Sequence, residues 1–235
     1  MIVSDPIVEG LYSMIRTGEL SPGERVDQRA ISERLDVSRT PLREALRALA
    51  ADGVLTRTPN AGYAVAKLRA SDLLQYYSMR TFMETEVLRT IRWPSAEELA
   101  ALRSVNESCR VAVEYGRVEQ LLAANREFHF TMFRLSPLNI MVSEIERIWR
   151  VSDPYRAIHL SNQDRRSNVA VDHDAMIAAI EQQDIPLLVT LMDGHRAASR
   201  SLVQQMLGAN VPMSLLTLPQ STAQLSARTA AASSH

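Results

Sequence analysis

The sequence predicts a mainly α-helical protein, in which an N-terminal winged helix-turn-helix with a small β-hairpin wing precedes a C-terminal antiparallel bundle of six helices. Three observations lead to this fold class. Residues 1–66 contain three short helical patterns, followed by two β-prone runs on either side of a turn. Residues 72–207 show only helical periodicity, with short connections between the segments. The hydrophobic fraction of 46% is large enough for a packed core.

The N-terminal region begins with a helix whose N-cap is Asp5, followed by a proline at the first helical position. Apolar residues keep a helical spacing up to Ile15, and the turn "GELSPGE" follows. A second short helix is expected from about Gln28 to Leu35. After the third helix, the runs "VLTRT" and "GYAVA" are joined by "PNA" and predict a hairpin. Three helices and a hairpin in this order are the layout of a winged helix-turn-helix.

The third helix, in "DVSRTPLREALRAL", has one apolar face and one arginine face. In a helix-turn-helix, the second helix of the pair presents its N-terminal residues to base edges in the major groove of DNA. Arg39, Thr40 and Arg43 occupy that end, directly after Ser38. An ordinary amphipathic helix with solvated arginines is the alternative at this point. The apolar residues with i, i+3, i+4, i+7 spacing are Leu42, Ala45, Leu46 and Leu49.

The second region follows a linker at residues 67–71, in which Ser71 is the expected N-cap. Asp153-Pro154 is a point at which one of its helices could break. From Gly208 the chain becomes small and polar, which predicts a mostly disordered tail at residues 208–235. The expected helices are Asp72 to Arg92, a second from the Ser95/Glu98 capping box to Gly116, and four more at about 118–135, 139–160, 168–183 and 186–207.

Composition and charge exclude several classes of protein. The net charge of −1 means that any nucleic-acid surface must come from the placement of charges rather than from their sum. No apolar run is long enough to span a membrane, and the N-terminus lacks the features of a signal peptide. The single cysteine, Cys109, cannot form an intrachain disulfide and is interpreted as a packing residue. These features predict a cytoplasmic protein with no membrane partner.

The helical region also contains histidines in a pattern that packing does not require. Asn125 and His129 lie four residues apart, on one face of one expected helix. His173 lies near the start of another helix, and His195 lies inside the last one. Three imidazoles and one oxygen ligand that converge in a bundle core can hold a divalent metal ion. Histidines that are hydrogen-bonded separately are the alternative, and His159 is assigned to that class.

The segment "GELSPGERVDQRAISERLDVSRTPLREALRALAADGVLTRTPNAGYAV" resembles the DNA-binding domain of the GntR family of bacterial transcription regulators. The resemblance runs without gaps from about Leu11 to Val65, and "SRTPLREAL" is among the most specific strings of the family. It implies a homodimer on double-stranded operator DNA. Many relatives carry a basic residue just before the glycine of the wing, whereas this chain has Ala61, which implies a weaker grip of the wing. The DNA contacts implied are Arg29, Ser38, Arg39, Thr40, Arg43 and Gly62.

The region from about Leu73 to Leu207 resembles the FCD ligand-binding domain, the all-helical C-terminal domain of the FadR branch of that family. The resemblance implies a divalent metal ion, with zinc first and nickel, manganese or iron as alternatives. It also implies a small carboxylate effector, with Arg80 at an effector-contacting position; an ion pair with Glu84 is the alternative. The metal ligands implied are Asn125, His129, His173 and His195, and the neutral Asn125 leaves the site one negative charge poorer than an aspartate would.

The features together predict a ligand-responsive, sequence-specific transcription regulator, a repressor by family habit, and not an enzyme. Effector binding would change operator affinity if the effector binds one arrangement of the two DNA-binding domains better than the other. A metal-dependent enzyme with an accessory DNA-binding domain is one alternative, since three histidines with open coordination positions could activate water. No separate motif for a general base is present, and Asp172 and Asp174 are interpreted as capping groups or as hydrogen-bond partners of a ligand. A regulator that binds its effector without metal is the other alternative.

Overall fold

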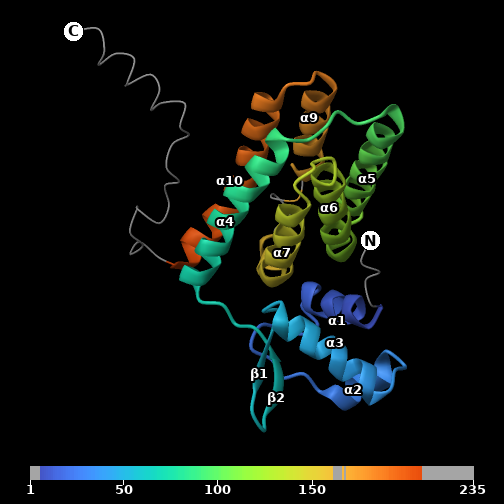
Figure 1. Ribbon diagram of the computed structural model, residues 1–235, viewed down its shortest axis with the longest axis vertical. Helices are drawn as coiled ribbons and strands as arrows, with labels where there is room; N and C mark the ends of the chain where they lie inside the picture. Colours follow the sequence, from blue (N-terminus) through green and yellow to red (C-terminus); the bar gives the residue numbers. More distant parts are fainter. Residues whose placement is uncertain (1–5, 161–165, 167, 208–235) are drawn as a thin grey trace, which may run out of the picture.

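A computed structural model describes residues 6–160, 166 and 168–207, and gives only the backbone at residues 156–160 and 198–207. The chain forms a small N-terminal domain and a larger helical domain, which lie one below the other in Figure 1. The predicted mainly α fold is confirmed. The predicted tail and the side chain of His159 lie outside the described parts.

The N-terminal domain is a winged helix-turn-helix, as the sequence predicts. Its elements are α1 (Pro6–Arg16), α2 (Gln28–Arg34), α3 (Arg39–Ala51), β1 (Leu55–Thr58) and β2 (Gly62–Val65). The two strands pair antiparallel, with Leu55 opposite Val65 and Thr58 opposite Gly62. Asp27 is the N-cap of α2, and its carboxylate accepts hydrogen bonds from the backbone N–H groups of Arg29 and Ala30. The apolar face of α3 is fully buried against α1, so the arginine face points outward.

The second domain is wholly helical among the residues that the structure describes. Helix α4 packs against α7 and α10, and α5 packs against α6 and α9. Their shared core contains the largest fully buried side chain, Trp149, together with Phe128 and Phe133. No described helix is long and apolar enough to cross a membrane. The elements are α4 (Ala70–Arg89), α5 (Ala96–Glu114), α6 (Val118–Phe133), α7 (Asn139–Leu160), α9 (Val169–Glu181) and α10 (Ile185–Leu207).

One local prediction in this domain, the N-cap of its first helix, is wrong, and the possible break at Asp153-Pro154 is absent. Helix α4 starts one residue before Ser71 and has Arg69 as its N-cap, because the Asp72 carboxylate accepts hydrogen bonds from both the backbone N–H and the side chain of Arg69. Helix α7 is not broken at Pro154 but continues to Leu160. The residues before the proline are buried on every side, and we attribute the continuity of the helix to this packing.

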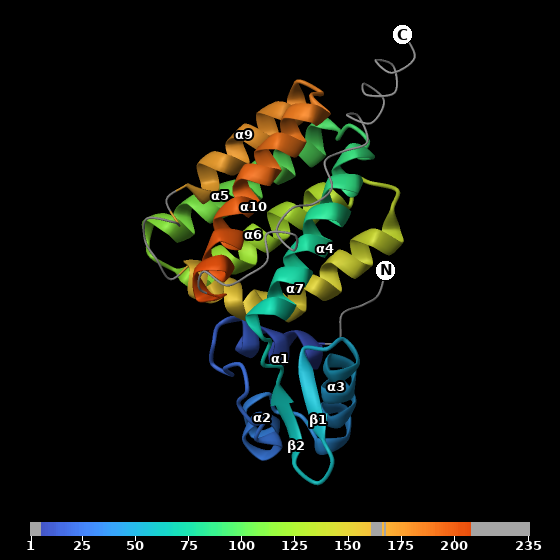
Figure 2. The ribbon, with the colours of Figure 1, turned by 90° about the vertical axis from the view of Figure 1, so that its left-hand side faces the viewer.

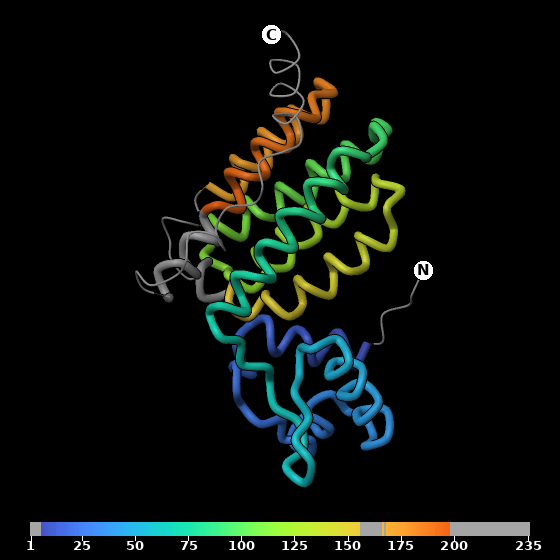
Figure 3. The backbone as a smooth tube through the Cα atoms, turned by 60° about the vertical axis from the view of Figure 1, so that its left-hand side comes forward, coloured from blue at the N-terminus to red at the C-terminus, as the bar shows by residue number. Residues whose placement is uncertain are grey.

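Helix α7 is the element on which the N-terminal domain rests, and α1 lies directly beneath it (Figures 1 and 2). Val151 of α7 belongs to the hydrophobic core of the N-terminal domain. The Arg147 guanidinium donates to the backbone carbonyl of Asp52 over 3.1 Å, and the Tyr155 hydroxyl accepts from the backbone N–H of Leu68 over 2.7 Å. The hairpin of β1 and β2 projects away from the bundle at the opposite end of the N-terminal domain (Figure 3).

Candidate DNA-binding surface and metal centre

A concave surface lies between α3 and the hairpin, with a volume of about 430 Å³. Gly62 adopts a φ of 86° and Asn60 a φ of 60°, so the tip of the hairpin bends tightly and its backbone stays open to an approaching ligand. Four of the predicted DNA contacts line this surface: Arg29, Arg39, Arg43 and Gly62. The other lining residues are Gln28, Leu42, Arg47, Arg57, Thr58, Asn60 and Tyr63.

The two remaining predicted contacts lie at the start of α3, outside the lining of this surface. Ser38 is the N-cap of α3 by backbone conformation, yet its side chain makes no capping hydrogen bond. Thr40 is exposed on the first turn. Both side chains are therefore available to a ligand at the N-terminal end of α3.

The arginines of α2 differ from those of α3 and β1 in their partners. Arg29 pairs with Glu33 over 3.0 Å, and Arg34 pairs with Glu19. Within the described residues, no acidic group pairs with the four arginines that α3 and β1 contribute. Four uncompensated guanidinium groups on one concave face create a positive potential that suits the phosphates of DNA. They are Arg39, Arg43, Arg47 and Arg57.

Arg57 is the residue that the sequence analysis missed on this surface. It lies on β1 opposite Tyr63, one position from the pair that includes Gly62. Pairing the two predicted strands residue by residue would have placed the Arg57 side chain next to the turn of the hairpin. The position of Arg57 supplies a cation to the wing, where Ala61 provides none.

Three histidines from three helices converge in the second domain. His129 comes from α6, His173 from α9 and His195 from α10, and one ring nitrogen of each lies within 4.8 Å of those of the others. The Nε2 atoms of His129 and His195 are 3.3 Å apart. Asn125 is buried one helical turn before His129 on α6. The helix packing therefore brings the three predicted histidine ligands together and sets Asn125 on the same helix as one of them.

The partners of two histidines determine which ring nitrogen faces the cluster. His195 Nδ1 lies 2.9 Å from a carboxylate oxygen of Asp172, which can only accept a hydrogen bond. His173 Nδ1 lies 3.1 Å from the side-chain oxygen of Asn106. The amide nitrogen of Asn106 donates to the Ala170 carbonyl and to Asp174, which fixes the orientation of the amide. Both Nδ1 atoms are therefore donors, which places the lone pair of each ring on Nε2.

This donor set fits a divalent metal ion. Neutral imidazoles held by a carboxylate or an amide on the far nitrogen are the usual form of histidine ligands, since the partner fixes the ring and raises its basicity. Asp174 also pairs with Arg110 over 2.7 Å, so the support of His173 extends to the surface of α5. Cys109 does not contribute to the donor set. It is fully buried, and burial raises the pKa of its thiol to about 12.

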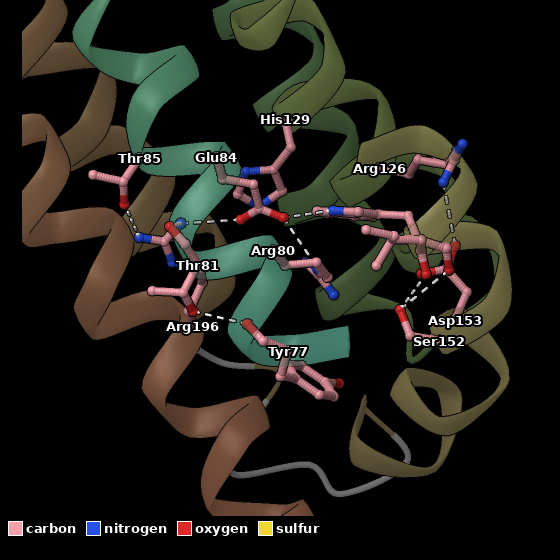
Figure 4. A network of polar contacts seen from close by, with 12 residues as sticks. Tyr77, Arg80, Thr81, Glu84, Thr85, Arg126, His129, Ser152, Asp153 and Arg196 are labelled. Atoms are coloured by element: carbon pink, nitrogen blue, oxygen red, sulfur yellow. Dashed lines mark hydrogen bonds and ion pairs between the residues drawn. The ribbon is translucent and has the colours of Figure 1, made fainter. Parts of the chain in front are cut away.

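A buried charge cluster adjoins the histidines, and Figure 4 shows it with His129 beside it. Glu84 is completely buried and accepts from Arg80 over 2.8 Å, from the Trp149 indole over 2.7 Å and from Arg196 over 3.2 Å. The rings of Trp149 and His129 have centroids 5.4 Å apart. The ion pair of Arg80 with Glu84, the alternative to an effector contact, is thus present.

The cluster carries more positive than negative charge at its centre. Arg80 lies over the Trp149 ring at 4.1 Å, and Arg196 also pairs with Asp193 at the edge. Burial of Glu84 favours its neutral form, but the two guanidinium groups outweigh that effect and hold its pKa below the ordinary value. Among the described residues, Arg80 Nη1 and Arg196 Nε are buried without a hydrogen-bond partner. A carboxylate could satisfy both donors.

Comparisons with known proteins agree with both regions. Residues 4–65 match the gntR family of bacterial regulatory proteins, and residues 75–198 match the FCD domain. The Nta operon transcriptional regulator of Aminobacter aminovorans is 33% identical over 54% of this chain and 60% of its own length. The gluconate operon transcriptional repressor of Bacillus subtilis is 26% identical over 76% of each chain.

Escherichia coli McbR is similar in both sequence and structure. Its sequence is 27% identical over 74% of this chain and 80% of its own. Its solved structure superposes with a TM-score of 0.73 over 86% of this chain and 97% of the other, at 21% identity. At that level of identity, the structural likeness shows the fold.

Proposed function

Because the chain belongs to the gntR family of bacterial regulatory proteins and carries an FCD domain, we propose that it is a repressor whose helical domain senses a small organic acid at a divalent metal ion. The family consists of DNA-binding transcription regulators and not of enzymes. The observation that carries the proposal is the convergence of His129, His173 and His195 next to two buried arginines. The repressor role is supported by the similarity to the gluconate operon repressor.

The metal ion would be held by the three histidines, with Asn125 as the oxygen ligand from the preceding turn. Zinc suits three imidazoles and one oxygen, while nickel, manganese or iron would use the same donors with more open positions. Bound there, the metal supplies a Lewis-acidic anchor for one carboxylate of the effector. Asp172 and Asn106 keep the ring nitrogens of two ligands turned toward it.

The effector would be an anion of small size. Arg80 and Arg196 each have a buried donor that is not used within the described residues. A buried donor without an acceptor costs free energy. An anion that accepts a hydrogen bond from it removes this cost, which makes the binding of the anion more favourable. Two guanidinium groups face the single buried carboxylate of Glu84, because Asp193, the other partner of Arg196, is half exposed, and this balance favours an added negative charge.

We further propose that the protein acts as a homodimer on a two-fold symmetric operator, with each α3 in one major groove. Two recognition helices about one turn of DNA apart, ~34–36 Å, explain a palindromic site. Met79 and Phe82 on α4 are 42% and 57% exposed and give the second copy an apolar contact. Light scattering should show two chains per particle, and Phe82→Glu should shift the particle toward one. A monomer with full operator affinity would refute this assembly.

The central test combines metal content, effector binding and operator binding on one preparation. Elemental analysis of the natively purified protein should find about one divalent ion per chain. A thermal-shift screen of organic acids should give hits with the metal-loaded protein and none after chelation. Those acids should weaken operator binding in fluorescence anisotropy. If the same acids bind equally well after chelation, the protein senses its effector through Arg80 and Arg196 alone.

A further inference from the structure

A buried polar contact joins the two domains where α1 meets α7. Tyr12 of α1 is 1% exposed and donates its hydroxyl hydrogen to a carboxylate oxygen of Asp153 on α7. Arg126 of α6 reaches the same oxygen over 3.4 Å, and its guanidinium lies 5.5 Å from the centre of the Tyr12 ring. Three elements from two domains thus share one carboxylate. Figure 4 shows the pair of Arg126 and Asp153 on the side of the bundle away from α10.

The contact between Tyr12 and Asp153 is buried, so water cannot replace either partner. Asp153 is 2% exposed, and its other oxygen has no hydrogen-bond partner among the described residues. Tyr12 and Arg126 are therefore the donors that stabilise the buried Asp153 carboxylate among the described residues. Losing either donor leaves the carboxylate poorly solvated. Burial raises the pKa of Tyr12, and the nearby Asp153 carboxylate raises it further, so the hydroxyl keeps its proton and remains a donor.

Arg126 connects this contact to the metal centre. It follows Asn125 directly on α6 and precedes His129 by less than one turn. Its guanidinium also pairs with Glu146 over 3.1 Å and lies 4.6 Å from the centre of the Phe130 ring. A rotation or shift of α6 that adjusts Asn125 and His129 around an ion must therefore move Arg126 as well. Packed helices of this kind move as units, because their side chains interlock.

We propose that Tyr12, Asp153 and Arg126 form a latch that fixes the DNA-binding domain against the bundle and couples its position to the state of α6. The inference rests on the proposed metal site, because it adds how occupancy of that site reaches the DNA-binding domain. Tyr12 and Arg126 are positioning residues. Neither belongs to the histidine cluster, and neither lines the surface between α3 and the hairpin. In the latched state α1 is held on α7, and in the released state it can tilt.

The first experiment tests the latch without metal or DNA. Hydrogen exchange of the full chain is compared for wild type, Tyr12→Phe and the control Tyr115→Phe, which removes a hydroxyl from a side chain that is exposed. Tyr12→Phe keeps the buried ring and removes only the hydroxyl. Exchange in α1 and in residues 66–70 should rise on the order of tenfold, with α2 and α3 unchanged, as expected for a lost hydrogen bond to a charged group. Unchanged exchange in α1 overturns the latch.

The second experiment tests the coupling, with Zn²⁺ as the probe. The operator affinity of the full chain is measured with chelator and with saturating Zn²⁺. The ratio of these two affinities measures the coupling between metal binding and DNA binding. Tyr12→Phe should bring this ratio close to one, while Tyr115→Phe leaves it at the wild-type value. Arg126→Lys should reduce the ratio too, and the double variant should go no further than the stronger single one, because the two act in one network.

The outcomes separate the two proposals. If the wild type binds Zn²⁺ and Tyr12→Phe keeps the full ratio, the coupling is refuted while the metal site stands. If the wild type binds no Zn²⁺, the proposed metal site fails and the coupling with it, and the exchange of α1 alone decides whether the latch exists. Faster exchange in α1 together with a ratio near one supports the inference in full.

Discussion

The imidazoles of His129 and His195 face each other through their Nε2 atoms, 3.3 Å apart, although the two residues are 66 positions apart in the chain. Because His195 Nδ1 donates its hydrogen to Asp172, His195 Nε2 carries a lone pair, and a proton on His129 Nε2 or a cation must lie between the two nitrogens. A divalent ion satisfies both nitrogens at once and adds His173 to the same centre. The separation is one that two ligands of a shared ion can have, and it is also that of a single N–H···N hydrogen bond from His129 to His195.

Removing the support of one ligand should weaken the site without touching a ligand. Asn106→Ala deletes the acceptor of the His173 Nδ1 hydrogen, so the ring loses its fixed orientation and tautomer. We expect Zn²⁺ affinity to fall by about 10- to 100-fold, as is typical for such partners of histidine ligands. Competition with a chromophoric chelator measures it. Asn139→Ala, at an exposed position, is the control, and equal affinities of the two variants would contradict the role of Asn106.

The N-terminal end of α3 should carry sequence specificity. Arg39→Ala and Arg43→Ala should each cost ~1–3 kcal/mol of operator binding, if each guanidinium makes a bidentate contact to a base. Both side chains line the surface between α3 and the hairpin and have no acidic partner among the described residues. Fluorescence anisotropy on operator and scrambled DNA distinguishes the possibilities. Equal losses on the two sequences would mean contacts to phosphate only.

Arg57 on the hairpin should act through phosphate instead. Arg57→Ala is expected to weaken binding to operator and scrambled DNA alike, and to reduce the slope of log affinity against log salt by about 1. The reason is its place on β1, across the concave surface from α3, where a backbone strand of DNA would pass. Anisotropy titrations at several salt concentrations test this. Arg89→Ala, which removes an exposed arginine paired with Glu86, should leave the slope unchanged.

Glu84 should contribute strongly to stability and to its pH dependence. Glu84→Gln leaves two buried guanidinium groups without their shared carboxylate, and we expect a loss of about 3–5 kcal/mol in the free energy of unfolding. The pKa of Glu84 in the folded protein lies below its ordinary value. Its contribution is therefore complete above the unfolded value, about 4.3, and is lost as the pH falls through the lower folded value.

Urea unfolding between pH 3 and pH 7 measures both effects. Glu86→Gln removes a half-exposed carboxylate paired with Arg89 and should change stability by less than about 0.5 kcal/mol. The Glu84→Gln variant should also show a weaker pH dependence than the wild type below about pH 5. If Glu84→Gln and Glu86→Gln behave alike, the buried cluster does not stabilise the fold as argued.

The hydrophobic periodicity of the sequence predicts most helices of this fold, whereas some of their exact ends depend on local side-chain chemistry that the periodicity does not show. The spacing of Leu42, Leu46 and Leu49 predicts the buried face of α3 because it depends only on helix geometry. The N-cap of α4 could not be predicted in the same way, since arginine is rarely a cap and acts here through Asp72.

Contacts between distant parts of the chain were beyond the reach of the sequence. Tyr12 and Asp153 are 141 residues apart, and no spacing rule connects them. The support of His173 by Asn106 likewise depends on how α5 packs against α9. The residues alone left the convergence of the three histidines as one of two open interpretations, because a pattern on separate helices does not determine which faces meet, and the family resemblance favoured it.

Asn125 is the residue on which the proposed site can be tested most sharply. A neutral amide oxygen binds a divalent cation less strongly than a carboxylate, because a hard cation gains most from a full negative charge. Asn125→Asp should therefore hold the metal more tightly and resist chelator for longer. The added charge should also repel an anionic effector and make the metal less electron-poor, so effector affinity should fall in calorimetry.

His129→Ala provides the opposite case and the control for folding. It should lose the metal and the effector response together, while the winged helix-turn-helix still binds DNA, because the N-terminal domain has a hydrophobic core of its own, to which the bundle adds Val151. Elemental analysis, calorimetry and anisotropy on both variants give a full set of readings. If Asn125→Asp changes neither metal retention nor effector affinity, Asn125 is not a ligand, and the centre consists of His129, His173 and His195 alone.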